Sequence, residues 1–137
     1  MIIADTGFFL ALGNESDLYH QQAKDLLQTL NEPLIATYPV ISETSYLIEK
    51  RIGIDAQSRF LRQFVQGYIL IFQLEIHHLE RMIELMQKYA DLPMDLADAS
   101  LVVTAEHLGH GRILTVDRRD FQIYRWQNQR PFENLFF

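Results

Sequence analysis

The amino-acid sequence predicts a three-layer α/β domain, in which a central, mainly parallel sheet of four to five strands lies between layers of helices. Short apolar runs of strand length alternate along the chain with longer segments whose apolar residues recur at helical spacing. Strands that alternate with helices are typical of a parallel sheet with helices on both faces. The 137 residues are the size of one domain with its own core, so a single domain over 1–137 is expected.

Strands are predicted where apolar residues are continuous, a pattern typical of buried strands. The runs are residues 1–4, 34–37, 68–74 and 112–116. Residues 121–126 are predicted as a short fifth strand.

Six segments between these runs carry the spacing of helices. They are residues 8–12, 17–30, 39–52, 55–66, 76–89 and 95–108. Ser16 is the expected N-cap of the second helix, because its hydroxyl can accept a backbone N–H of the first turn. Pro39 is expected to open the third, since its fixed φ suits a first helical turn. Gly53 and Gly109 stand where glycine most often ends a helix.

Composition narrows the class of protein. The chain has no cysteine, which excludes disulfides, thiolate metal sites and a cysteine nucleophile, and predicts a reducing, cytoplasmic location. The N-terminus has no basic start and reaches Asp5 early, so no signal peptide is predicted, and no apolar run approaches the roughly 18 residues of a membrane span. The net charge of −6 argues against a plain nucleic-acid binder, unless several acids surround a divalent cation that reverses the local field.

Two aspartates follow directly after predicted strands, Asp5 after the first and Asp117 after the fourth. The carboxyl ends of parallel strands share one edge of a sheet, and ligands bind in the crevice at that edge. These two carboxylates are therefore predicted to face the same crevice. The alternative is that each is a turn residue that caps the next helix.

Glu43 is predicted on the apolar face of its helix, because Val40, Glu43 and Leu47 follow the i, i+3, i+7 spacing. An unpaired carboxylate on such a face costs several kcal/mol. The alternatives are that Glu43 binds a cation, carries a proton, forms a salt bridge or sits at the rim of the buried face.

Asp95 and Asp98 lie one helical turn apart at the start of the last helix. Asp95 is expected mainly to cap this helix, with Asp98 as the reciprocal residue of a capping box. Asp98 also shares the apolar face of the helix, so it is expected to point into the crevice. Asp120 is expected to have a capping or turn role, with a lesser contact to the site.

Four acids from distant segments are thus predicted to converge: Asp5, Glu43, Asp98 and Asp117. Two unpaired carboxylates about 4 Å apart repel by about 4 kcal/mol at an effective dielectric constant of 20, so four need a cation or bound protons. Oxygen ligands without Cys or His favour Mg²⁺ or Mn²⁺ over Zn²⁺. Such an ion serves phosphodiester hydrolysis, because it activates water and stabilises the leaving oxygen.

Four segments of the chain occur in an order and spacing that resembles the PIN-domain ribonucleases, specifically the VapC-type toxins of VapBC toxin–antitoxin pairs. They are IIADTGFFLAL, PVISETSYLI, MDLADASLVVTAEHLG and ILTVDRRDFQIYR, and the resemblance covers nearly the whole chain. It implies a PIN-like α/β/α fold and endoribonuclease activity on a structured RNA, often tRNA or rRNA. It also implies homodimerisation and inhibition by a small cognate antitoxin protein.

The resemblance carries over to individual residues. It implies that the acidic metal ligands are Asp5, Glu43, Asp98 and Asp117. Thr6 and Thr115 match polar positions beside them, where a hydroxyl can hydrogen-bond a ligand carboxylate or a bound water. Asp95 and Asp120 match acids often seen beside the central set.

Two further regions are candidates for contacts with partners. Arg118 and Arg119 follow Asp117 and can meet RNA phosphates or pair with neighbouring acids. The aromatic segment 124–137 can pack on the body or form an exposed apolar patch. Part of it, or the helices near residues 40–65, is expected to bind the antitoxin or a second subunit.

Two other families of Mg²⁺-using α/β domains match the acid pattern of this chain poorly. A receiver domain has neighbouring acids near its first strand, and a haloacid-dehalogenase phosphatase has a second Asp two residues after the first; here that position is Gly7. The remaining alternatives are a PIN nuclease of RNA processing without a toxin role, and a PIN-scaffold binding module without activity.

Overall fold

Five parallel strands form the central sheet of the computed structural model, which describes residues 1–137. The strands are β1 (Ile2–Ala4), β2 (Leu34–Ala36), β3 (Ile69–Ile71), β4 (Arg112–Leu114) and β7 (Glu133–Asn134). Their order across the sheet is β3-β2-β1-β4-β7. β1 lies at the centre, and Ile3 pairs with Ile35 on one side and with Ile113 on the other. The predicted α/β fold with a parallel sheet is confirmed.

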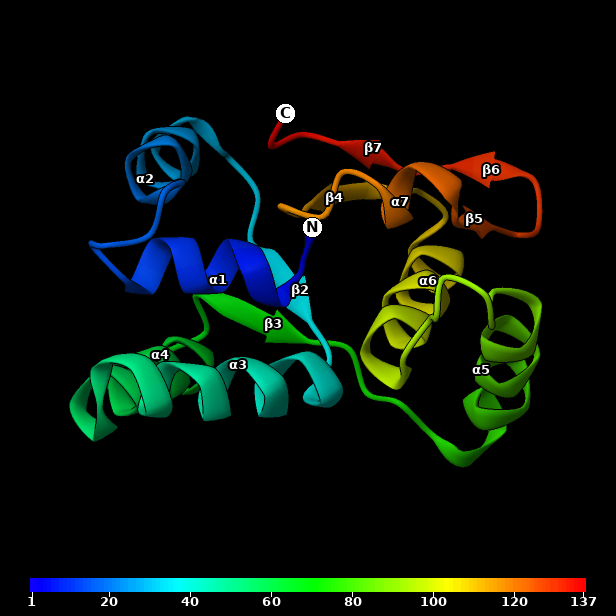
Figure 1. The fold of residues 1–137 in the computed structure, drawn as a ribbon, viewed down its shortest axis with the longest axis horizontal. Coiled ribbons are helices and arrows are strands. Elements are labelled where there is room, and N and C mark those ends of the chain that lie inside the picture. The colour runs from blue at the N-terminus through cyan, green and yellow to red at the C-terminus, as the bar shows by residue number, and fades with distance from the viewer.

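Seven helices pack around this sheet (Figure 1). They are α1 (Thr6–Gly13), α2 (His20–Thr29), α3 (Tyr38–Ile52), α4 (Ile54–Val65), α5 (Ile76–Lys88), α6 (Leu96–Leu108) and α7 (Asp120–Ile123). The chain steps in one direction across the sheet from β1 to β2 to β3 and then steps back to β4. Right-handed crossovers therefore place α1 to α4 on one face and α5 and α6 on the other. Figure 1 shows these two groups in the left and right parts of the molecule.

The core lies between the sheet and the inner faces of these helices, and one cluster of 34 buried hydrophobic residues fills it. Every residue of β1 and β2 is buried, which explains why their sequences are apolar without alternation. None of the helices combines the length and the apolar character that a membrane span requires.

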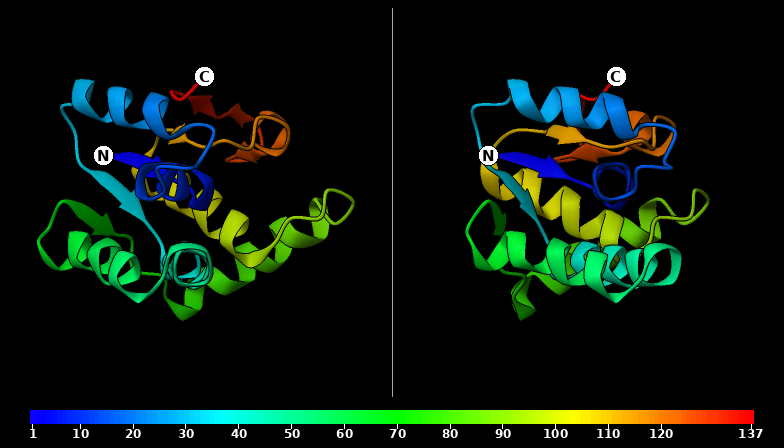
Figure 2. Two further views of the ribbon diagram at one scale, coloured as in Figure 1. Left: turned by 60° about the vertical axis from the view of Figure 1, so that its left-hand side comes forward. Right: turned by 90° about the vertical axis from the view of Figure 1, so that its left-hand side faces the viewer.

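Helix starts gather at the carboxyl ends of the strands. A single residue separates α1 from β1, and a single residue likewise separates α3 from β2. Figure 2 (right) shows α1 at the end towards which β1 and β4 both point. The hydroxyl groups of Thr37, before α3, and Ser100, in α6, are buried and hydrogen-bonded at 2.7 Å. This bond fixes the first turns of α3 and α6 side by side at the same edge.

The second helix begins later than predicted, at His20, and Ser16 does not cap it. The side-chain oxygens of Asn14 and Asp17 accept the backbone N–H groups of Ser16 and Tyr19 at 3.0 and 2.9 Å. These local bonds hold the segment in turns, because Asn and Asp compete with the backbone for such donors.

The prediction of a strand over residues 121–126 is wrong. Its first part forms α7, and β5 (Arg125–Trp126) pairs only with β6 (Arg130–Pro131) in a separate antiparallel hairpin. Phe121 and Tyr124 are both buried and lie three residues apart, which is the spacing of a helix. The apolar run is too short for its sequence to distinguish a helical period from that of a strand. The fifth strand of the main sheet is β7, which the sequence analysis missed.

Candidate active site at the carboxyl edge of the sheet

Asp5 and Asp117 meet at the ends of the neighbouring strands β1 and β4. The backbone N–H of Asp5 donates to the carbonyl of Leu114 at 3.1 Å. The buried hydroxyl of Thr115 links the two aspartates, because it donates to Asp5 Oδ2 at 3.1 Å and accepts the backbone N–H of Asp117 at 3.0 Å. The structure therefore brings these two predicted residues together, with Thr115 between them.

Asp5 also caps α1, the alternative role weighed for it. Its Oδ1 accepts the backbone N–H of Thr6 at 2.7 Å. Part of the residue is open to solvent, yet its surroundings are crowded enough that burial raises the pKa of its carboxyl from 3.8 to about 6. The hydrogen bonds from Thr6 and Thr115 lower this pKa, and the charges of Glu43 and Asp117 raise it further. Asp5 thus lies within the electrostatic reach of two of its predicted companions.

Asp98 reaches the same edge from the first turn of α6. Asp95 Oδ1 accepts the backbone N–H of Asp98 at 2.8 Å, and Asp98 Oδ2 accepts that of Asp95 at 3.4 Å, so the expected capping box is present. Burial raises the pKa of the Asp98 carboxyl, followed by the charges of Asp95 and Asp5. Asp98 therefore both caps its helix and adds a carboxylate beside Asp5.

Glu43 lies at the rim of the site. The prediction that it belongs to the apolar face of α3 is wrong, because the buried position is the next residue, Thr44. The buried positions of that face are Val40, Thr44 and Ile48, while Glu43 is exposed. Sequence spacing cannot fix the centre of a buried face, because adjacent helix positions are only about 100° apart. Burial of part of its surface, and then the charge of Asp95, raise the pKa of Glu43. Of the alternatives weighed for Glu43, the rim position is the one observed.

A hydroxyl without a partner lies among these acids. The Thr6 side chain is near enough to Glu43 to lower the pKa of its carboxyl, yet its buried Oγ1 forms no hydrogen bond of normal geometry. A buried hydroxyl left unpaired costs about 1–3 kcal/mol. Here it stands where a bound water or an ion's hydration shell would satisfy it.

The acids line the edge without closing on a single point. No three acidic or histidine side chains of the protein lie close enough together to enclose a metal ion. Carboxylates that repel one another spread apart until a cation offsets their charge. The donors are all oxygens, a set whose chemistry suits Mg²⁺ or Mn²⁺.

Asp120 does not have the capping role expected for it. Asp117 supplies that contact instead, since its Oδ1 accepts the backbone N–H of Asp120 at 2.9 Å at the start of α7. Burial and then the charge of Asp117 raise the pKa of Asp120. Arg119 lies 3.8 Å from the Asp120 carboxylate, the pairing that was weighed as the alternative to a phosphate contact.

Comparison with known proteins identifies the family. The family model described as the PIN domain matches residues 2–126.

The chain belongs to the PIN-domain family.

Two relatives extend this similarity. The chain is 29% identical over 124 residues to Ribonuclease VapC26 of Mycobacterium tuberculosis, a match that covers 90% of this chain and 92% of that protein. Its fold resembles that of the M. tuberculosis VapC20 crystal structure, titled a sarcin-ricin loop cleaving toxin, with a TM-score of 0.84, 23% identity, and coverage of 96% of this chain and 100% of the other. The predicted PIN-like three-layer fold and the predicted resemblance to VapC-type proteins are confirmed.

Two residues that sequence reasoning did not place in the site support it in this PIN domain. Tyr124 is fully buried, and its hydroxyl donates to Asp98 Oδ2 at 3.3 Å. Asn134 in β7 donates to the carbonyl of Thr115 at 3.0 Å and accepts its N–H at 3.3 Å. A buried tyrosine hydroxyl needs a polar partner, which is the signal that could have drawn attention to Tyr124. No sequence pattern indicates Asn134.

The aromatic tail of the PIN domain packs on the body. Phe136 is buried, with its ring centroid 5.4 Å from that of Phe8 and 5.8 Å from that of Tyr19. Phe137 remains 40% exposed, and the guanidinium of Arg118 lies 4.0 Å from its ring centroid. Little of the tail is left as the exposed apolar patch considered from sequence.

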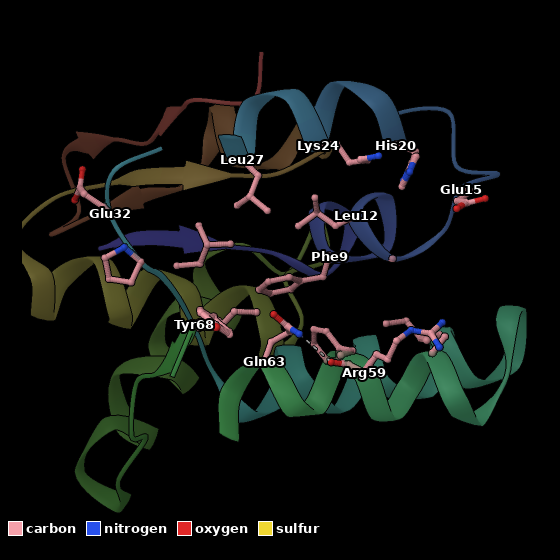
Figure 3. A pocket seen from close by; sticks show the side chains of 17 residues that line it. Phe9, Leu12, Glu15, His20, Lys24, Leu27, Glu32, Arg59, Gln63 and Tyr68 are labelled. Atoms are coloured by element: carbon pink, nitrogen blue, oxygen red, sulfur yellow. Dashed lines mark hydrogen bonds between the residues drawn. The ribbon is translucent and has the colours of Figure 1, made fainter. Parts of the chain in front are cut away.

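A separate cavity of the PIN domain is shown in Figure 3. It has a volume of about 570 Å³ and is walled by α1, α2, α4 and the first residues of β2 and β3. Phe9, Leu12 and Phe60 are among its apolar residues, and Lys24 and Arg59 lie along its sides. None of the four predicted metal ligands lines it.

Proposed function

We propose that this PIN domain is a metal-dependent endoribonuclease that hydrolyses RNA phosphodiester bonds, and that it is the toxin of a type II toxin–antitoxin pair. The observation that carries the proposal is the crowding of carboxylates at one edge of the sheet. Asp5 is affected by the charges of Glu43 and Asp117, and Asp98 by that of Asp5. Such crowding opposes stability, so a function that uses the charge is the physical reason to keep it.

The metal ligands in this proposal are Asp5, Glu43, Asp98 and Asp117. When bound, Mg²⁺ or Mn²⁺ would lower the pKa of an attacking water and neutralise charge on the scissile phosphate. The chain's own contribution is to hold the carboxylates in place. Thr115 fixes Asp5 and the backbone of Asp117, and Asp95 fixes the first turn that carries Asp98.

Four residues take supporting roles in the proposal. Thr115 and Asp95 position ligands through the hydrogen bonds described above. The unpaired hydroxyl of Thr6 is available to a water that enters with the ion. Asp120, whose backbone N–H donates to Asp117 Oδ1, restrains that carboxylate and has the least direct part.

The relatives support RNA as the substrate. One is named a ribonuclease, and the other is titled a toxin that cleaves the sarcin-ricin loop. A structured RNA, either tRNA or rRNA, is therefore the proposed substrate class. A PIN nuclease of RNA processing without a toxin role is the alternative, and a non-catalytic binding module is the second.

The test is cleavage of total cellular RNA by the purified chain, with Mn²⁺ and with EDTA. We expect cleavage only with the ion, and we expect Asp5→Asn to abolish it while the far-ultraviolet circular dichroism spectrum stays unchanged. Asp91→Asn, which changes an exposed acid outside the site, is the matched control and should cleave normally. Full activity of Asp5→Asn would refute the proposal. Growth arrest on expression alone would favour the toxin over the processing enzyme.

The antitoxin is proposed to dock in the 570 Å³ cavity. Its apolar floor suits the apolar face of a short helix. Lys24 and Arg59 form no ion pair within the chain, so acidic residues on that helix would find partners. Arg59→Glu should then weaken antitoxin affinity measured by calorimetry without changing RNA cleavage by the free chain. Equal affinity of the variant would place the antitoxin elsewhere.

Homodimerisation is proposed through α5. Ile76, Leu79 and Ile83 follow the i, i+3, i+7 spacing on this helix and are 86%, 48% and 43% exposed, which leaves an unpartnered apolar stripe. Light scattering after gel filtration should give a dimer for the natural chain and a monomer for Leu79→Glu. A dimer that survives this change would exclude the α5 stripe.

A further inference from the structure

A second cavity opens beside Asp117, between the loop that follows β4, α7 and the aromatic tail. Its volume is about 280 Å³, and its walls include Arg118, Gln122, Phe132 and Phe137. Small-molecule pockets begin at roughly 300 Å³, so this cavity suits a single flat group and is too small for a whole cofactor. Asp117 belongs both to this cavity and to the carboxylate edge, so an occupant would lie next to the proposed reaction.

The aromatic walls of the cavity offer surfaces for a flat ring. Phe132 is partly exposed and is held by an edge-to-face contact with buried Phe121, with 5.3 Å between ring centroids. Phe137 keeps 40% of its surface exposed while its ring carries the guanidinium of Arg118. A guanidinium fixed on an aromatic ring is itself a flat, cationic surface on which a base can stack.

Two polar side chains of the cavity, those of Arg118 and Gln122, are free of partners within the chain. Arg118 forms no hydrogen bond and no ion pair, although Asp117 and Asp120 are its neighbours in sequence. Gln122 is exposed, and its side-chain amide has no partner within the chain. Asn134 by contrast is committed to Thr115 and to the backbone N–H of Phe136. Donors and acceptors for a ligand therefore come from Arg118 and Gln122.

We propose that this cavity binds the base of the nucleotide adjacent to the scissile phosphate and gives the enzyme a base preference there. A base fits better than a phosphate, because the Asp117 carboxylate repels an anion while the rings stack with any base. The free amide and guanidinium can hydrogen-bond base edges, which allows one base to be distinguished from another. This inference rests on the proposed RNA cleavage.

The experiment uses a pool of random-sequence RNA 20-mers, cleaved with Mn²⁺ and sequenced at the new ends. The natural chain should show a preference at one position flanking the cut. Arg118→Ala should weaken that preference and lower kcat/KM by roughly tenfold, the size of a lost stacking contact. Gln122→Ala should flatten the same position with a smaller loss of rate. No preference in the natural chain, or an unchanged preference in both variants, overturns the proposal.

Arg119→Ala is the matched control for charge, because Arg119 is 76% exposed and does not line the cavity. It should lower RNA affinity through the same loss of one positive charge while leaving the base preference unchanged. Gln129→Ala controls for the amide, since Gln129 is exposed on the hairpin. An equal loss of preference in Arg119→Ala would show a general electrostatic effect and overturn the assignment.

A binding experiment separates this inference from the cleavage activity itself. The same RNA pool, made with 4-thiouridine and held in EDTA, is cross-linked to the natural chain by ultraviolet light and mapped by mass spectrometry. Cross-links at Phe132 or Phe137 support the base site even if the chain cuts no RNA. Cross-links confined to other surfaces, such as the 570 Å³ cavity, overturn it while leaving the proposed nuclease untouched.

Discussion

The carboxylate edge of this PIN domain and its 570 Å³ cavity are built on opposite principles. The carboxylate edge, where Asp5 and Asp117 follow β1 and β4, gathers like charges, and burial raises the pKa values of Asp5 and Asp98. The larger cavity, at Leu34 and Ile69 where β2 and β3 begin, is walled mainly by apolar side chains. The crowded charges of the edge lower the stability of the chain, whereas the aromatic walls of the cavity stabilise the fold.

The largest effect should separate two glutamates on the same helix. Glu43→Gln should lower kcat/KM for RNA cleavage by roughly 10²- to 10³-fold, the loss expected when one group that stabilises transition-state charge is removed. Glu49→Gln, also exposed on α3, should cleave at the natural rate. A similar loss in both variants would indicate a general charge effect, and Glu43 would then have no specific role in the site.

A substitution in the 570 Å³ cavity should lower the stability of the chain and leave RNA cleavage nearly unchanged. Phe60 is 8% exposed, and its ring lies edge to face with those of Phe9 and Phe64 at centroid distances of 5.3 Å each. Phe60→Ala should lower the free energy of unfolding by about 3–4 kcal/mol, measured by urea denaturation. The rate of RNA cleavage at 20 °C should remain close to natural while the chain is folded. A large loss of kcat in the folded variant would mean that the two regions are coupled.

Asp5→Asn should stabilise the chain when no divalent ion is present. The pKa of Asp5 is raised in the folded chain from 3.8 to about 6, so the folded state binds more protons than the unfolded state between these values. The free energy of unfolding contributed by this group therefore falls as pH rises through that window. In EDTA above pH 6 the variant should be more stable than the natural chain by about 2 kcal/mol, after allowance for partial exposure.

Measuring the stability of the natural chain and of Asp5→Asn across the pH range separates the contribution of Asp5 from those of other titrating groups. Arg112 lowers the pKa of Glu32 to about 2, which gives the opposite slope below pH 4.5 in both chains. Saturating Mn²⁺ should raise the melting temperature of the natural chain and have much less effect on Asp5→Asn. An Asn variant less stable than the natural chain at pH 7 in EDTA would contradict the view that the edge is strained by charge.

The smallest effect should come from the hydrogen bond that orients Asp98. Tyr124→Phe removes the hydroxyl that donates to Asp98 Oδ2 at 3.3 Å while keeping the ring packed against Phe121 and Tyr89. We expect about a tenfold weaker affinity for Mn²⁺ in a calorimetric titration, because groups that orient ligands contribute on this scale. Tyr89→Phe is the control, because it removes a hydroxyl that accepts the backbone N–H of Arg125 at 3.1 Å, and it should leave the Mn²⁺ affinity unchanged. Unchanged Mn²⁺ affinity in Tyr124→Phe would show that Tyr124 only fills space.

The sequence was sufficient for the ends of β1 and β4 and for the start of α6. The apolar runs before Asp5 and Asp117 predicted strands that end there, and parallel topology predicted that the two acids would share an edge. The Asp95–Asp98 spacing predicted a capping box, and both of its bonds are present. Glu43 shows the limit of predictions from periodicity. The predicted buried face of α3 was displaced by one residue, so it included Glu43, which is exposed at the rim.

The sequence by itself determined the alternation of strands and helices, the apolar core and the identity of the acids, since these depend on burial patterns and on caps formed between near neighbours. Only the tertiary structure decided which strand closes the sheet, which hydroxyls hold the carboxylates and where the cavities lie. β7, Thr115 and Tyr124 owe their positions to contacts across 19, 110 and 26 residues of chain. Contacts of that range arise from the packing of the whole chain, and no local pattern encodes them.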